Sequence, residues 1–174
     1  MKKNLLFLGA AMIITAFSAN VNAAGNTTGK ANLVDALTLT NKADLDFGTM
    51  CVSSASAICK MDLNALRTTT SGTISFITSP APTCARYEVT GNVSTSYNIT
   101  IPTVALSLTG SPDLTVGSWQ VRDVTNSTDY SALYQGKTDA SGKGIFELTG
   151  SLTIPSGFKN GQFTTTFDVT IAYQ

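Results

Sequence analysis

The chain has 174 residues, with 11 basic and 11 acidic side chains, no histidine and three cysteines. Without histidine, neither a Ser-His-Asp nor a Cys-His catalytic arrangement is possible, and the cysteines lack the spacing of zinc ligands. We therefore expect no enzymatic activity, no metal and no cofactor. The low charge content, without a basic cluster, also argues against nucleic-acid binding.

The first residues have the pattern of a secretory signal peptide. Lys2 and Lys3 precede an almost continuously apolar stretch, residues 5–17, and small residues suit cleavage after Ala23. The sequence therefore predicts a signal peptide at residues 1–23. The apolar stretch is too short to span a membrane, so we expect export without membrane insertion.

Short stretches of period-two alternation follow, each bounded by Gly, Pro, Asn or Ser. They predict a first strand in two halves at 36–40 and 44–48, and further strands at 59–63, 72–77, 85–91, 97–102, 104–108, 114–116, 119–121, 145–154 and 161–174. The clearest hairpin joins 85–91 to 97–102. Because no helical periodicity occurs after residue 24, the pattern predicts one all-β domain, an antiparallel β-sandwich at 36–174, behind an N-terminal extension at 24–35.

Two of the three cysteines bracket a short segment between strand-like runs. Cys51 and Cys59 are separated by seven residues, so a disulfide between them would close the base of a hairpin. An exported protein passes through an oxidising compartment, which favours such a bond. We expect Cys51 to pair with Cys59 and Cys84 to stay free. The rival arrangement pairs Cys84 with either of the others.

The C-terminal strand alternates most regularly. One face carries Phe163, Phe167, Val169, Ile171 and Tyr173, and the other carries Thr164, Thr166, Asp168, Thr170 and Ala172. Together with a penultimate aromatic, Tyr173, and a glycine fourteenth from the end, Gly161, this strand resembles that of pilus subunits assembled by the chaperone-usher pathway. The resemblance implies a pilin-like, immunoglobulin-like β-sandwich. It also implies that Gly161 and the apolar residues form an assembly strand. In such subunits a periplasmic chaperone pairs with this strand, which later borders the groove that receives the N-terminal strand of a neighbouring subunit, and an outer-membrane usher is a further expected partner.

A second resemblance covers residues 31–174. The motif Leu45-Asp-Phe-Gly48, the stretches 85–91 and 97–102 and the closing strand look like those of a secreted bacterial family of single β-sandwich domains without assigned function. That family is itself similar to pilins. It implies the fold and export more than a function.

Two functional hypotheses follow. In the first, the protein is a structural subunit of a cell-surface fimbria that contributes to adhesion and polymerises by donating its N-terminal strand to a neighbour. Gly29, Ala31 and Leu33 then lie on one face of the donor segment, a pattern that is only weakly apolar. In the second, the protein is a self-contained secreted or surface binding module of the same fold.

Overall fold

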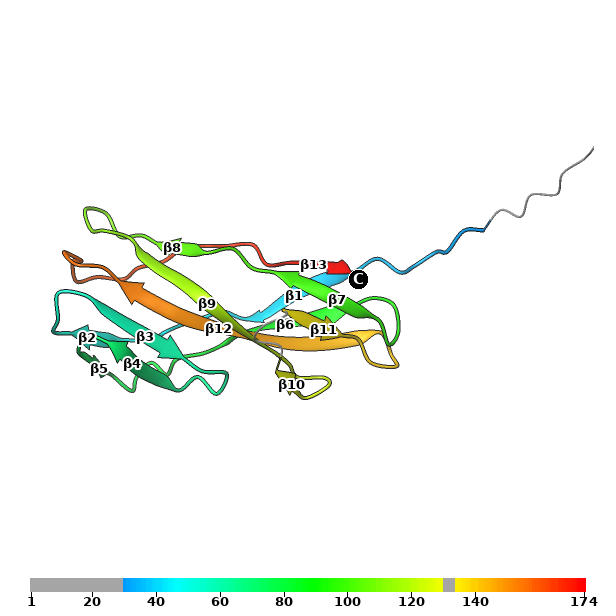
Figure 1. Cartoon of the computed structure of the whole chain (residues 1–174), viewed down its shortest axis with the longest axis horizontal. Coiled ribbons are helices and arrows are strands. Elements are labelled where there is room, and N and C mark those ends of the chain that lie inside the picture. The colour runs from blue at the N-terminus through cyan, green and yellow to red at the C-terminus, as the bar shows by residue number, and fades with distance from the viewer. Residues whose placement is uncertain (1–29, 130–133) are drawn as a thin grey trace, which may run out of the picture. The chain divides into compact units, whose positions relative to one another are not determined.

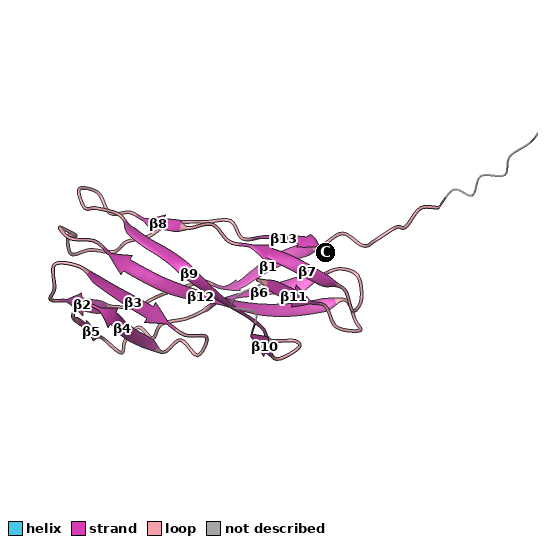
Figure 2. Cartoon of the chain, viewed as in Figure 1, coloured by secondary structure: helices cyan, strands magenta, loops and turns pink. Residues whose placement is uncertain are grey.

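The computed structural model describes residues 30–129 and 134–174. The predicted signal peptide, residues 1–23, lies outside the described residues, as do residues 24–29 of the predicted extension. In the described part of the chain every regular element is a β-strand, no helix occurs, and every strand pair is antiparallel (Figures 1 and 2). The prediction of an all-β, antiparallel domain is confirmed.

The strands follow one another with short connections. In chain order they are β1 (Thr38–Ala43), β2 (Met50–Val52), β3 (Ala57–Met61), β4 (Arg67–Ser71), β5 (Ile74–Phe76), β6 (Ala85–Thr90), β7 (Ser96–Thr100), β8 (Val104–Leu106), β9 (Leu114–Asp123), β10 (Thr128–Asp129), β11 (Gln135–Lys137), β12 (Lys143–Ile154) and β13 (Thr170–Tyr173).

Strand β12 organises the largest sheet. Its first half pairs with β6, its second half pairs with β3, and β9 runs along nearly all of it (Figure 1). β1 extends the sheet beyond β6, β4 extends it beyond β3, and β8 and β10 pair with β9. A three-stranded sheet has the order β11-β7-β13, and β2 and β5 form a two-stranded sheet.

The core contains the inward side chains of these strands. Fully buried members include Tyr97 on β7, Val89 on β6 and Phe146 on β12. The Phe146 ring stacks on Tyr87 with 5.0 Å between the centroids, and it lies 6.3 Å from the Tyr97 ring. The three-stranded sheet therefore packs its inner face against that of the largest sheet.

The predicted hairpin between residues 85–91 and 97–102 is wrong. Both segments form strands, but β6 pairs with β1 and β12, whereas β7 pairs with β11 and β13. The reason is that β6 and β7 each have one buried face, and these two faces lie in different sheets that pack against each other. Packing the β7 side chains over those of the largest sheet buries Tyr97 completely.

Three further elements differ from the sequence prediction. The expected strands 114–116 and 119–121 form one strand, β9, with an irregularity opposite Thr149–Ser151. The second half of the first strand, 44–48, forms only a single bridge, from Asp46 to Thr83. β4 has the sequence Arg-Thr-Thr-Thr-Ser, which lacks the apolar alternation that predicts a strand.

The predicted Cys51–Cys59 disulfide is not formed, because all three cysteines are free thiols. The expected hairpin does not exist: Cys51 lies on β2, which pairs with β5, while Cys59 lies on β3, which pairs with β4 and β12. Cys51 is exposed and Cys59 is buried. Burial raises the pKa of the Cys59 thiol to about 11, although the charge of Arg67 lowers it slightly.

Candidate functional site

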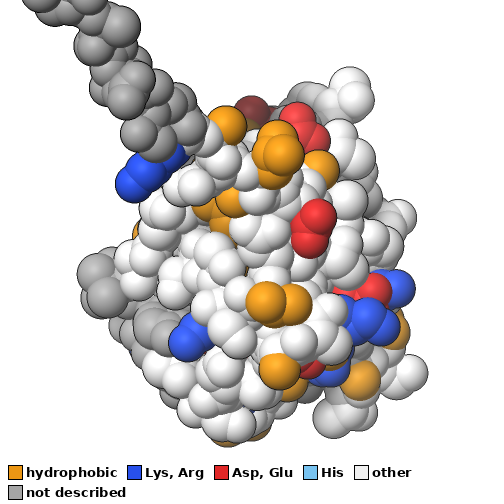
Figure 3. Space-filling model, turned by 90° about the vertical axis from the view of Figure 1, so that its right-hand side faces the viewer, with side chains coloured by type: hydrophobic (Ala, Val, Ile, Leu, Met, Phe, Trp, Pro, Cys, Tyr) orange, Lys and Arg blue, Asp and Glu red, His pale blue; other side chains and the backbone are white. Residues whose placement is uncertain are grey.

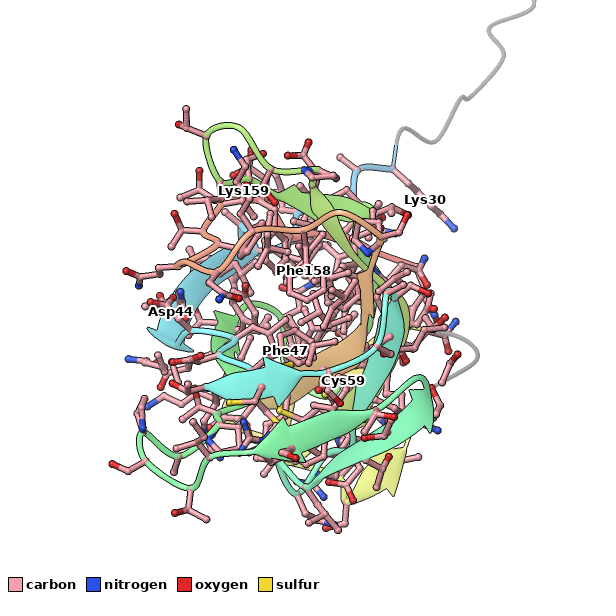
Figure 4. All side chains as sticks on the ribbon, turned by 90° about the vertical axis from the view of Figure 1, so that its left-hand side faces the viewer. Lys30, Asp44, Phe47, Cys59, Phe158 and Lys159 are labelled. Carbon is pink, nitrogen blue, oxygen red and sulfur yellow. The ribbon has the colours of Figure 1, made fainter. Side chains whose placement is uncertain are left out.

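An apolar groove of about 920 Å³ lies between two segments that are far apart in the sequence, residues 44–52 and residues 158–167. Its floor consists of buried side chains from the largest sheet and its neighbours: Phe47, Val104, Leu114, Val116, Leu152 and Ile154. Its sides are half-buried apolar side chains: Leu45, Met50, Val52, Leu106, Phe158, Phe163 and Phe167. Figure 4 views this end of the domain, with Asp44, Phe47, Phe158 and Lys159 labelled.

The Leu45-Asp-Phe-Gly48 motif begins the first wall of the groove. The Asp46 carboxylate accepts a hydrogen bond from the Gly48 N–H at 2.6 Å, and this tight turn gives Gly48 a φ of +65°. Glycine adopts such a φ without the strain that a side chain causes. The turn directs Phe47 into the core and leads the chain into β2.

Arg67, on β4, holds this wall in place. Its guanidinium donates to the carbonyl oxygens of Phe47 at 2.8 Å, Thr49 at 3.0 Å and Ile77 at 2.7 Å. It also lies 4.8 Å above the ring of Phe76. One side chain therefore ties the segment before β2 to the segment after β5.

The first wall ends in an open sheet edge. Ser53 N–H donates to Thr73 and Ile77 N–H donates to Thr49, so odd-numbered residues of this segment pair with β5. In an antiparallel ladder the intervening residues direct their N–H and C=O groups to the opposite side. These residues are Met50 and Val52, and within the described residues no second strand pairs with β2.

The second wall is the C-terminal segment. Phe163, Phe167, Val169, Ile171 and Tyr173 are half-buried, and the residues between them are exposed. Phe167 stacks on the buried Trp119 with 5.6 Å between the ring centroids. Gly161 passes close to Leu108, because a Cβ at Gly161 would lie 2.5 Å from Leu108 Cδ2.

The predicted strand 161–174 is shorter than expected. Only β13, residues 170–173, forms a ladder with β7, and Thr164 makes a single bridge to Ser107. Between them, residues 165–169 belong to no strand. The cause lies in the segment that follows β7. After β7 this segment leaves the three-stranded sheet and joins the largest sheet as β8, so residues 165–169 have no strand of the described chain beside them to pair with. The second wall therefore also presents an incompletely paired edge.

The predicted donor segment precedes β1. Gly29 lies outside the described residues, and Ala31 is exposed. The two large apolar side chains of this segment are also exposed, Leu33 to 97% and Val34 to 62%. The described residues before β1 form no strand.

The root of this segment is held by a ring of three hydrogen bonds. Asp35 N–H donates to Asn92 Oδ1 at 2.7 Å, Asn92 N–H donates to Tyr173 Oη at 2.6 Å, and Tyr173 Oη donates to the Asp35 carbonyl at 2.8 Å. We call Asp35, Asn92 and Tyr173 the latch. The latch could not be predicted from the sequence, because its members are distant in the chain and no short motif marks such a contact.

The described residues contain no cluster of three or more His, Cys, Asp or Glu side chains that could hold a metal ion. Glu147 forms ion pairs with Arg86 at 2.7 Å and Arg122 at 2.5 Å on the outer side of the largest sheet. Among the described residues there is also no helix with the length and apolarity that crossing a membrane requires.

A family model for a domain of unknown function (DUF4402) matches residues 37–173. The match includes both walls of the groove and Tyr173, and it begins after the predicted donor segment. No curated protein and no solved structure matches the chain. The expected likeness to a β-rich family of unknown function is thereby confirmed, and the chain belongs to the DUF4402 family.

Proposed function

We propose that the protein is a structural subunit of a bacterial surface fimbria that polymerises by strand exchange and so contributes to adhesion. In this proposal the domain is a pilin-like, immunoglobulin-like β-sandwich with an open seam between residues 44–52 and 158–167. The observation that carries it is the apolar groove, because both of its walls end in incompletely paired backbone edges.

An extended segment suits this groove. A strand placed between β2 and residues 165–169 would find backbone partners on both sides and bury alternate side chains on the apolar floor. Asp44, Asp46 and Lys159 line the groove beside the apolar side chains and supply a polar rim. Unpaired strand edges are ready sites for pairing with another chain.

The occupant that we propose is the N-terminal segment of a second copy. Leu33 is two residues from Asp35, which the latch holds beside Tyr173. Two extended residues span about 7 Å, whereas β1 alone, which separates this point from the groove, spans about 20 Å. Leu33 and Val34 therefore cannot reach the groove of their own molecule, and the groove of a neighbour is the place where they could be buried.

The energetic gain from this segment is moderate. Burying Leu33 and Val34 contributes about 1.5–3 kcal/mol for each side chain, and the preceding small and polar residues add mostly backbone hydrogen bonds.

In this proposal the chain is exported through the periplasm behind residues 1–23. A periplasmic chaperone covers the groove and an outer-membrane usher assembles the subunits on the cell surface. The role is structural rather than enzymatic.

A matched pair of variants tests the proposal. A synthetic peptide of residues 24–35 should bind the purified protein, and light scattering should detect assemblies of the protein itself. Phe163→Asp places a charge in the groove and should weaken peptide binding about 100-fold, whereas Thr166→Asp, on the exposed side of the same wall, should change it less than about 3-fold. Circular dichroism checks that both variants fold. A wild-type protein that neither assembles nor binds the peptide would contradict the proposal.

One observation favours a second candidate function, a self-contained binding module. The groove volume of about 920 Å³ lies within the range of ordinary ligand pockets, and its apolar lining with a polar rim is typical of them. In this case the protein should remain a stable monomer when residues 24–33 are deleted, and the peptide should not bind. The same peptide experiment therefore separates the two functions.

A further inference from the structure

The latch uses both backbone groups of Asp35, an exposed residue in a segment without secondary structure. The partners are distant in the sequence: Asn92 is 57 residues away and Tyr173 is 138 residues away. All three hydrogen bonds are 2.8 Å or shorter. The point at which the chain joins the domain is therefore fixed at Asp35.

Gly91 makes room for this arrangement. A Cβ at Gly91 would lie 2.4 Å from Tyr173 Oη and 2.8 Å from Leu37 Cδ2. The Gly91 N–H donates to the Gly142 carbonyl at 2.9 Å, which ties the loop carrying Asn92 to the turn before β12. The phenol is thus held against a part of the domain that is itself anchored to the central strand.

The apolar side chains of this segment remain in solvent. Figure 3 shows the end of the domain from which the segment leaves. Leu33 and Val34 are exposed, so the domain positions the root of the segment without binding its apolar side chains.

We propose that Tyr173 is a positioning residue. It fixes the start of the N-terminal segment of one copy and so presents this segment to the groove of a second copy. This inference rests on the proposed function. Fixing the root reduces the conformational freedom that the segment would otherwise lose on binding, and it keeps Leu33 and Val34 away from their own molecule. The C-terminal segment then has two tasks: residues 163–167 line the receiving groove, and Tyr173 presents the donor segment.

The first test measures the latch itself. Tyr173→Phe removes the phenol oxygen and keeps the ring. Amide hydrogen exchange at Asp35 and Asn92 should become about 10-fold faster, while exchange at Val89 and Phe146 in the core should not change. Tyr134→Phe is the matched control. It also removes a phenol oxygen, but the Tyr134 Oη lies 3.5 Å from the Trp119 carbonyl oxygen, and that hydrogen bond involves no residue of the latch. Gly91→Ala, which displaces the phenol, should reproduce the faster exchange.

The second test measures presentation. Tyr173→Phe should slow assembly of the full chain about fivefold, but it should bind the free peptide of residues 24–35 as the wild type does, because the groove is unchanged. Unchanged exchange at Asp35, or assembly at the wild-type rate, would overturn the inference. If the wild type neither assembles nor binds the peptide, the proposed function fails and the presentation role fails with it. Faster exchange in Tyr173→Phe would still show that the phenol fixes the exit of the segment.

Discussion

The central strand β12 and the seam between residues 44–52 and 158–167 differ in how completely their backbones are paired. β12 has hydrogen-bonded neighbours on both sides, and its own side chains Phe146, Leu148 and Leu152 are buried in the core. The seam has two incompletely paired edges and half-buried aromatic side chains. The difference indicates that stability resides mainly around β12, and in our proposal the seam is the part of the domain that accepts another chain.

The largest expected effect compares aromatic residues from the two regions. Phe146→Ala should lower the free energy of unfolding by about 3–5 kcal/mol, because the ring is fully buried between Tyr87 and Tyr97. Phe163→Ala should lower it by only about 1 kcal/mol, because that ring is already partly in water. Urea denaturation measures both values. Equal losses would mean that the seam is as much a part of the core as β12 is.

The alkylation rates of two free cysteines compare the groove with the core, because Cys51 is exposed and Cys59 is buried. At about pH 8 only about one Cys59 thiol in a thousand is ionised, since burial raises its pKa to about 11, and the thiolate is the reactive form. Iodoacetamide should therefore label the exposed Cys51 beside the groove about 100-fold faster than Cys59. Peptide mapping by mass spectrometry gives the ratio. Cys51 that is labelled only after reduction would instead restore the disulfide predicted from the sequence.

The sequence predicted the two regions unequally. In β6 the alternation of Ala85, Tyr87 and Val89 marks the buried face correctly, and the structure buries all three. Periodicity does not specify the partner strand, however, so Tyr97 was placed beside β6 although it packs across the core from Phe146. β4 could not be predicted because Arg67-Thr-Thr-Thr-Ser71 has no apolar face.

The groove is a tertiary feature, which explains why the sequence revealed only one of its walls. The alternation of the C-terminal segment identified Phe163 and Phe167, and these side chains do line the groove. The opposite wall depends on hydrogen bonds from Arg67 to Phe47, twenty residues away, and nothing in the local pattern marks that contact. The latch joins residues that are even more distant.

Removing the Arg67 contacts should have an effect of intermediate size on stability. Arg67→Ala should lower the free energy of unfolding by about 2 kcal/mol, because one guanidinium donates to three carbonyl oxygens, and the hydrogen bond to the carbonyl of the buried Phe47 is itself partly buried. Arg67→Lys should recover less than half of this loss, since an ammonium lacks the planar fork of donors. Limited proteolysis should show faster cleavage within residues 46–52 in both variants. Full recovery by lysine would indicate that only the charge matters.

The smallest expected effect concerns the turn that leads into β12, the fully paired strand. The Asp139 carboxylate accepts hydrogen bonds from Lys143 N–H, from Ser141 Oγ and from Ser141 N–H, and these bonds hold the pKa of Asp139 below its ordinary value. A carboxyl group whose pKa is lower in the folded state stabilises the fold above its unfolded pKa, and this stabilisation is lost as the pH falls through the folded pKa.

The wild type should therefore be slightly more stable than Asp139→Asn at neutral pH, and the difference should disappear under acid conditions, below the ordinary pKa of an aspartate. Thermal unfolding across this pH range measures the difference. Asp168→Asn is the matched control, because Asp168 is exposed and lies within residues 165–169, which belong to no strand. A pH-independent difference for Asp139→Asn would show that the turn depends on shape rather than on charge. An equal pH dependence in Asp168→Asn would show that the effect does not arise from the turn beside β12.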